Sequence, residues 1–173
     1  MAGFKTKVTP EIEKLTDICR DNTSLDLSLY AKYDVKRGLR DINGKGVLAG
    51  LTQVSNVQAT KVVDGKEVPC AGKLSYRGYD IKDLTKGFIQ DDRYGFEEVA
   101  YLLLFGKLPD KQQLMDFTEL LANQRSLPTN FVRDVIMKAP SRDIMNGLSR
   151  SVLTLYSYDH NPDDTSLPNV LRQ

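Results

Sequence analysis

The fold of this chain is decided by residues 96–109, FEEVAYLLLFGKLP. Apolar side chains recur there at the spacing of one helical face, at Phe96, Val99, Leu102 and Leu103. Gly106 and Pro109 then end the helix, because glycine accepts the left-handed backbone of a helix C-terminus and proline cannot continue a helix. The stretch therefore predicts a helix of the length found in protein cores.

Further helices are predicted before this stretch. Thr9 caps a helix whose first residue is Pro10 and which ends near residues 21–22. A second helical segment covers about residues 24–33. The apolar face of the first helix is made of Ile12, Leu15, Ile18 and Cys19.

Helices are also predicted after it. Start signals stand at Asp110 with Gln113, at Pro128, and at Ser141 with Asp143 in the first turn. The side chains expected to face inward are Leu114, Phe117, Leu120 and Leu121 in the first, Phe131, Val132, Val135 and Ile136 in the second, and Ile144, Met145, Leu148, Val152 and Leu155 in the third.

Residues 36–80 have a different character, with frequent glycine and with β-branched residues that alternate with polar ones. Residues 62–68, VVDGKEV, predict a hairpin, because Asp64-Gly65 supplies the positive φ angles of a two-residue type I′ turn. The flanking strands are expected to span three to five residues each. We therefore predict a mainly α, multi-helical fold with a small antiparallel β-hairpin near residues 51–80.

Composition excludes several classes of protein. The chain has 24 basic and 23 acidic residues, a net charge of +1, so no nucleic acid is expected as a partner. No apolar run reaches the roughly 18 residues of a membrane span, and the N-terminus does not resemble a secretory signal. Cys19 and Cys70 form neither a metal-spaced pair nor a disulfide framework, which favours a reducing, cytoplasmic location.

Two motifs are considered and rejected. Residues 38–46 superficially resemble a phosphate-binding P-loop, but five residues rather than four separate Gly38 from Gly44, and Gly46 stands where a Ser or Thr should be. His160, the only histidine, could form a metal site with Asp159, Asp163 and Asp164. A solvated loop is the better interpretation of that polar, proline-containing stretch, so we predict no metal site.

Four segments, in order, resemble citrate synthases. They are residues 38–40 with 46–47 and 52–55, residues 72–81 (GKLSYRGYDI), residues 96–109, and Met145 with Leu148. The resemblance runs from about Asp34 to the end, and residues 139–164 are most similar to a bacterial branch. One departure is Asp143-Ile144-Met145, where many family members carry His-Pro-Met.

This resemblance implies a domain organisation and a reaction. Residues 1–33 would be an N-terminal helical segment, and residues 34–173 the N-terminal part of the large domain, truncated, with its C-terminal part and the small domain absent. The family condenses acetyl-CoA with oxaloacetate to citrate and CoA at the entry to the tricarboxylic acid cycle, without a further cofactor, as a homodimer. Its catalytic residues, two histidines and an aspartate, match no position here, so we assign no catalytic residue and expect this chain alone to be inactive.

Arg40 is the one residue to which the resemblance gives a binding role. It resembles a family arginine near the phosphates of coenzyme A, and Gly38 would allow close approach of the backbone. The alternative is a surface or interdomain ion pair. Arg77 is expected to be structural, with Gly78 in a turn, Tyr76 and Tyr79 packed, and the guanidinium on a nearby carboxylate or carbonyl.

Two other functions stay open. A 2-methylcitrate synthase would use propionyl-CoA, and a non-catalytic helical interaction or regulatory module would have no activity. Several apolar stripes could also lie exposed in this chain, so we expect it to self-associate.

Overall fold

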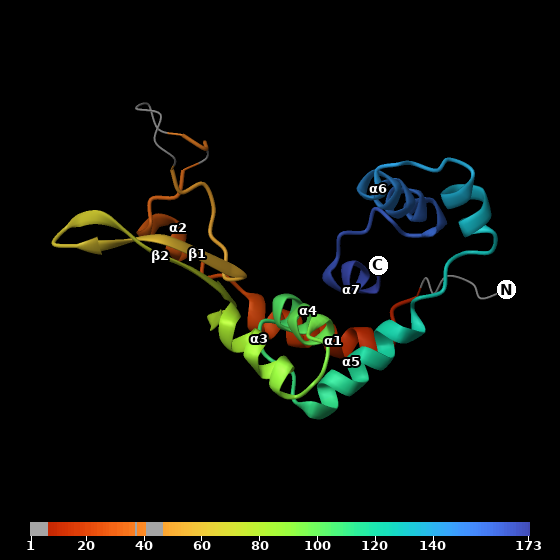
Figure 1. The fold of residues 1–173 in the computed structure, drawn as a ribbon, viewed down its shortest axis with the longest axis horizontal. Coiled ribbons are helices and arrows are strands. Elements are labelled where there is room, and N and C mark those ends of the chain that lie inside the picture. The colour runs from red at the N-terminus through yellow and green to blue at the C-terminus, as the bar shows by residue number, and fades with distance from the viewer. Residues whose placement is uncertain (1–6, 37, 41–46) are drawn as a thin grey trace. The chain divides into compact units, whose positions relative to one another are not determined.

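The computed structural model describes residues 7–36, 38–40 and 47–173. The chain divides into two compact units. The central unit is Cys19–Phe117, and the terminal unit is Met1–Ile18 together with Thr118–Gln173. Helices make up most of the described secondary structure, with a small antiparallel sheet in the central unit, so the predicted fold class is confirmed (Figure 1).

The helices predicted near residues 10–22, at residues 96–105 and after Asp110 lie close to their predicted positions. Thr9 caps the first of them, since its hydroxyl accepts the backbone N–H of Ile12 at 3.4 Å. The predicted second segment is shorter than expected. The helices are α1 (Pro10–Thr23), α2 (Ser28–Lys32), α3 (Ile81–Gln90), α4 (Phe96–Phe105) and α5 (Lys111–Asn123).

Helix α4 supplies the core of the central unit. Tyr101, Leu102 and Phe105 are each at most 1% exposed. The rings of Tyr101 and Phe105 lie 4.6 Å apart, and each meets the ring of Phe117 from α5 nearly edge-on, at 5.4 and 5.6 Å. Phe96, predicted to face inward, is 71% exposed. The prediction was wrong at this residue because the buried face of α4 is centred on its C-terminal half.

The C-terminal end of α4 is fixed by close contacts. Gly106 follows the helix with φ +77°, and a Cβ at this position would lie 2.7 Å from the carbonyl oxygen of Asn22 at the end of α1. Only glycine satisfies both the backbone and the space. The next helix begins with the predicted capping box, in which Asp110 accepts from the Gln113 N–H at 2.8 Å and the Gln113 side chain accepts from the Asp110 N–H at 3.0 Å.

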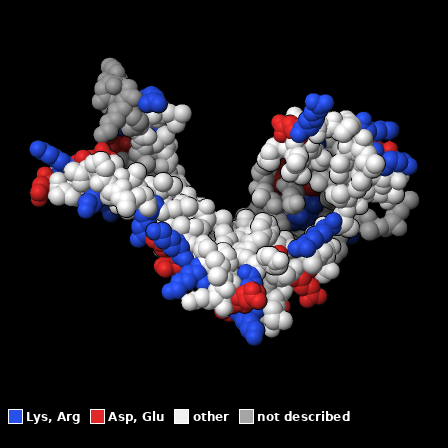
Figure 2. All heavy atoms as spheres, in the orientation of Figure 1, with Lys and Arg blue, Asp and Glu red and all other residues white. Residues whose placement is uncertain are grey.

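The sheet has the order β1-β2-β3, antiparallel throughout, from Ser55–Val63 (β1), Lys66–Tyr76 (β2) and Tyr79–Asp80 (β3). Asp64 and Gly65 connect the first two strands with φ of 51° and 72°, as predicted for a type I′ turn. The strands are longer than expected, and β1 is exposed along its whole length. Figure 2 shows basic and acidic side chains mixed over this hairpin.

The terminal unit contains η1 (Val132–Met137), α6 (Ile144–Leu155), η2 (Tyr156–Tyr158) and α7 (Leu167–Arg172). The helix predicted after Pro128 is a π-helical segment whose start, Phe131, is buried and packs on Tyr158 at 5.8 Å. The predicted cap of α6 was wrong. Asp143, rather than Ser141, is the N-cap, because its extended backbone aims its carboxylate at the N–H of Asn146 at 3.2 Å.

The faces of η1 and α6 that were predicted to face inward are largely exposed. Periodicity identifies an apolar helix face but does not show which segment packs on it. In η1 and α6 the described residues leave this face largely uncovered. The exposed side chains are Val132, Ile136, Ile144, Met145, Leu148 and Val152. Self-association through such a surface stays a prediction.

Tyr101 provides a test of the core. Its buried hydroxyl has no hydrogen-bond partner among the described residues, and burial, followed by the charge of Asp110, raises the pKa of the phenol. Replacing Tyr101 with Phe removes an unsatisfied polar group, so the free energy of unfolding should stay unchanged or rise by about 1 kcal/mol. Urea denaturation followed by circular dichroism measures this.

The matched control is Phe105→Leu, which thins the same aromatic cluster and should lower the free energy of unfolding by about 1–2 kcal/mol. A comparable loss in Tyr101→Phe would mean that the hydroxyl is hydrogen-bonded in solution.

Candidate functional site

Arg40 lies on an exposed backbone arm of the central unit. The arm pairs with the returning chain through two hydrogen bonds, from the N–H of Lys36 to the carbonyl of Leu48 at 2.6 Å and from the N–H of Val47 to the carbonyl of Leu39 at 3.3 Å. Arg40 is the last described residue of the outgoing side. The rest of the rejected P-loop-like stretch, residues 41–46, lies outside the described residues. The pairing holds the two sides together directly beside Arg40.

The surroundings of Gly38 are open. A Cβ there would meet nothing within 4 Å, and Gly38 is not among the glycines with positive φ. The glycine is therefore not required by the local fold, and a ligand can approach its backbone. A guanidinium beside open backbone can bind a phosphate through parallel N–H donors. The role of Arg40 stays a prediction.

Arg77 joins this arm to the helical part of the central unit. Its backbone N–H binds the carbonyl of Val54 at 2.9 Å, and its Nε and Nη2 donate to the carbonyl of Leu103 in α4 at 3.2 and 2.7 Å. The expectation of a carbonyl partner for Arg77 and of a turn conformation at Gly78, with φ +89°, is confirmed. Tyr79, expected to pack, is instead 42% exposed.

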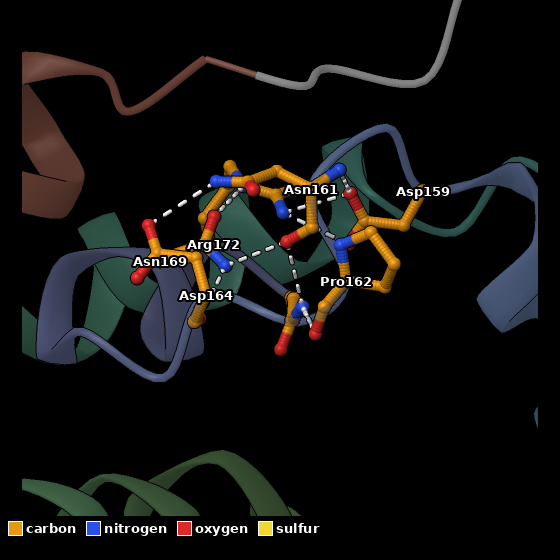
Figure 3. Close-up of polar contacts among 7 residues, drawn as sticks. Asp159, Asn161, Pro162, Asp164, Asn169 and Arg172 are labelled. Carbon is orange, nitrogen blue, oxygen red and sulfur yellow. Dashed lines mark hydrogen bonds and ion pairs between the residues drawn. The ribbon is translucent and has the colours of Figure 1, made fainter.

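The terminal unit contains a second arginine site, shown in Figure 3, that the sequence did not reveal. Arg172, only 5% exposed, donates from Nη2 to both carboxylate oxygens of Asp159 at 2.9 and 2.8 Å. Its Nε donates to the side chain of the buried Asn169 at 2.9 Å. Asn169 in turn donates to the carbonyls of Asn161 and Asp164 at 2.9 and 2.7 Å. We call Asp159, Asn161, Asp164, Asn169 and Arg172 the loop clamp.

The loop clamp engages carboxylates of the acidic stretch that was considered above as a metal site. The hydrogen bond from Arg172, and next the N–H of Asn161, hold the pKa of Asp159 below its usual range. A carboxylate with both oxygens on a guanidinium is poorly available to a cation. His160 is exposed at a bend between these residues. No group of three or more His, Cys, Asp or Glu within the described ranges is placed to hold a metal ion.

Sequence reasoning missed the loop clamp because its two ends carry no joint local signal. Asp159 and Arg172 are 13 residues apart, and a polar loop stands between them. Ser166-Leu167-Pro168 is a local signal for a helix start, and Asn169 and Arg172 lie on the helix that follows, α7. A helix start alone does not tell which loop its polar side chains contact.

A sequence model for one protein family, described as "Citrate synthase, C-terminal domain", matches residues 39–172. The chain belongs to the citrate synthase family. The predicted correspondence of residues 34–173 to the N-terminal part of the large domain is a finer statement, which this match does not test, and it stays a prediction.

Several curated proteins are similar to this member of the family. A 2-methylcitrate synthase 2 of Corynebacterium glutamicum is 37% identical over 106 residues, 61% of this chain and 22% of that protein. Citrate synthases of Saccharolobus solfataricus and Haloferax volcanii are 31% and 34% identical over 118 and 132 residues, 68% and 75% of this chain and 28% and 29% of those proteins. The chain thus spans less than a third of each of these relatives. No solved structure matches it.

None of the helices in the described residues combines the length and the apolar character that crossing a bilayer requires.

The loop clamp predicts an acid-dependent stability. Because the pKa of Asp159 is lowered in the folded chain, its ion pair stabilises the fold above the unfolded-state value, about pH 3.9, and is lost as pH falls through the lower folded-state value. Asp159→Asn should lower the free energy of unfolding by about 2 kcal/mol at pH 7. The difference from the unmodified chain should shrink below about pH 4.

Urea denaturation at several pH values measures this difference. Asp163→Asn is the matched control, because Asp163 is an exposed carboxylate of the same loop that accepts from the Tyr156 hydroxyl at 2.6 Å. Asp163→Asn should lower the free energy of unfolding much less than Asp159→Asn does. A pH-independent difference for Asp159→Asn would show that the carboxylate charge does not stabilise the loop.

Proposed function

We propose that the protein carrying this chain is an enzyme of the citrate synthase type, which condenses an acyl-CoA with oxaloacetate. The observation that supports it most is the family match over residues 39–172, most of the chain. The relatives named above are themselves called citrate synthase or 2-methylcitrate synthase. A homodimer in the cytoplasm is part of the same proposal.

The chemistry explains why this chain alone is proposed to be inactive. The condensation needs a carboxylate that removes a proton from the acyl carbon next to the thioester, and a donor that stabilises the resulting enol. A second donor polarises the ketone of oxaloacetate. In the family both donors are histidines, whereas this chain has only His160, which is exposed at a bend beside the loop clamp.

The part of the reaction that this chain supports is binding of the acyl-CoA. We propose that Arg40 contacts the phosphates of coenzyme A. Its exposed position at the end of a paired backbone arm, next to the open backbone at Gly38, supports this role. A phosphate contact remote from the reacting carbon strengthens binding of substrate and transition state alike, so it should affect KM more than kcat.

The acyl group is the main question about the substrate. The similarity to 2-methylcitrate synthases favours testing propionyl-CoA beside acetyl-CoA. Thiol release by the full-length protein, with oxaloacetate and each acyl-CoA in turn, distinguishes the two from their ratio of kcat/KM. If no thiol is released from either acyl-CoA, the enzyme proposal is wrong and the non-catalytic module is favoured.

Replacing Arg40 with Ala in the full-length enzyme should raise the KM for the preferred acyl-CoA about tenfold and leave kcat nearly unchanged. The reason is that a charge-assisted hydrogen bond to phosphate contributes roughly 1.5 kcal/mol or more. Initial rates at saturating oxaloacetate measure both constants.

The control is Lys61→Ala, which removes an exposed cation from β1 in the same unit and should leave KM unaltered. If Arg40→Ala binds acyl-CoA as well as the unmodified enzyme does, Arg40 has a structural ion-pairing role instead.

A further inference from the structure

Two tight turns in the sheet use different residues at the same position. Asp64-Gly65 and Arg77-Gly78 each join paired antiparallel strands through two residues, with φ of 51° and 72° in the first and 49° and 89° in the second. Asp and Asn tolerate such a backbone because their short side chains hydrogen-bond locally, whereas arginine does not have this compensation. The second turn therefore keeps an arginine at a conformational cost.

The contacts of Arg77 account for that cost. Its guanidinium donates two hydrogen bonds to the carbonyl of Leu103, one of the last-turn carbonyls of α4 that have no partner within the helix. Its backbone N–H holds the carbonyl of Val54, the residue directly before β1. Arg77 thus connects the chain entering the sheet to the most buried helix of the central unit. Such strain persists where the surroundings hold it in place, and it is a reason to look for a role.

The chain that Arg77 holds is continuous with the arm that carries Arg40. Residues 47–54 run from the paired position at Val47 to the bond at Val54. Gln53 adds a weaker bond from its side chain to the carbonyl of Ser24, at 3.4 Å. The returning side of the arm is therefore held at both ends, by the outgoing side next to Arg40 and by Arg77 at its base.

We propose that Arg77 is a positioning residue that fixes the Arg40 arm against α4 and so sets where Arg40 meets the acyl-CoA. The inference rests on the binding role proposed for Arg40. Arg77 does not touch the ligand. Its guanidinium anchors the turn on the carbonyl of Leu103, and its backbone N–H holds Val54 and, through Val54, the paired arm.

The test is Arg77→Asn in the full-length enzyme. Asparagine suits a positive φ better than arginine, so the turn is kept and only the link to Leu103 is removed. The KM for acetyl-CoA, or for propionyl-CoA if that is preferred, should rise about three- to tenfold, with kcat within about twofold. Arg77→Lys, which can donate one bond to the same carbonyl, should give an intermediate KM.

Asp64→Arg is the matched control. It places arginine in the other two-residue turn, which measures the cost of the residue type without altering the link to α4. It should lower the melting temperature and leave KM unaltered. If it raises KM as much as Arg77→Asn does, general destabilisation explains the effect and the positioning role is wrong.

The double variant Arg40→Ala with Arg77→Asn separates the two proposals. If Arg77 acts through Arg40, the KM of the double variant should equal that of Arg40→Ala alone, because the residue being positioned is gone. If the KM increases of the two single variants multiply in the double variant, the positioning role is wrong. If Arg40→Ala raises KM and neither Arg77 variant does, only the positioning role fails. If Arg40→Ala has no effect, the binding role fails first and the inference with it. Should Arg77→Asn not fold, Arg77→Lys decides by the same comparison.

Discussion

The central unit depends on the last turn of α4. Three successive carbonyls there accept hydrogen bonds from three partners: Leu102 from the N–H of Gly106, Leu103 from the guanidinium of Arg77, and Leu104 from the thiol of Cys19 at 3.4 Å. The carbonyls of Leu103 and Leu104 lie in the last turn, where the helix itself supplies no donor. Tyr101, Leu102 and Phe105 are buried in the same part of the helix. Apolar burial and backbone satisfaction therefore coincide at one place, where α1, the sheet and α5 all contact α4.

This arrangement explains how a small, exposed sheet can hold a defined position. A two-stranded hairpin with both faces in solvent has little stability of its own. The hairpin of β1 and β2 is fixed at its base instead, where Arg77 follows β2 and contacts α4. The Arg40 arm enters the sheet beside this base, through Val54. The candidate binding arm is thus supported by the core without belonging to it.

The terminal unit uses a different means. Its loop clamp orders a polar loop with an almost fully buried arginine–carboxylate pair, and the carboxamide of Asn169 satisfies two loop carbonyls. Meanwhile the apolar face of α6 stays exposed among the described residues. In the terminal unit the buried hydrogen bonds of the loop clamp and the apolar face of α6 are therefore separate features, whereas in the central unit hydrogen bonds and apolar burial meet at the end of α4. The aligned part of this chain corresponds to less than a third of each relative named above.

The sequence by itself determined the local elements and the family. Thr9, the Asp64-Gly65 turn, the Asp110–Gln113 capping box and Gly106 are local signals, which depend on residues within a few positions of one another, and all four are confirmed. A carbonyl was predicted as a partner of Arg77, but the sequence did not show that it belongs to Leu103, 26 residues away. The loop clamp and the exposure of Phe96 were not predicted, and exposed apolar stripes were expected without identifying the helix α6 that carries one. Tertiary structure alone decided these features, because pairing across a loop and the covering of an apolar face depend on which segments meet in space.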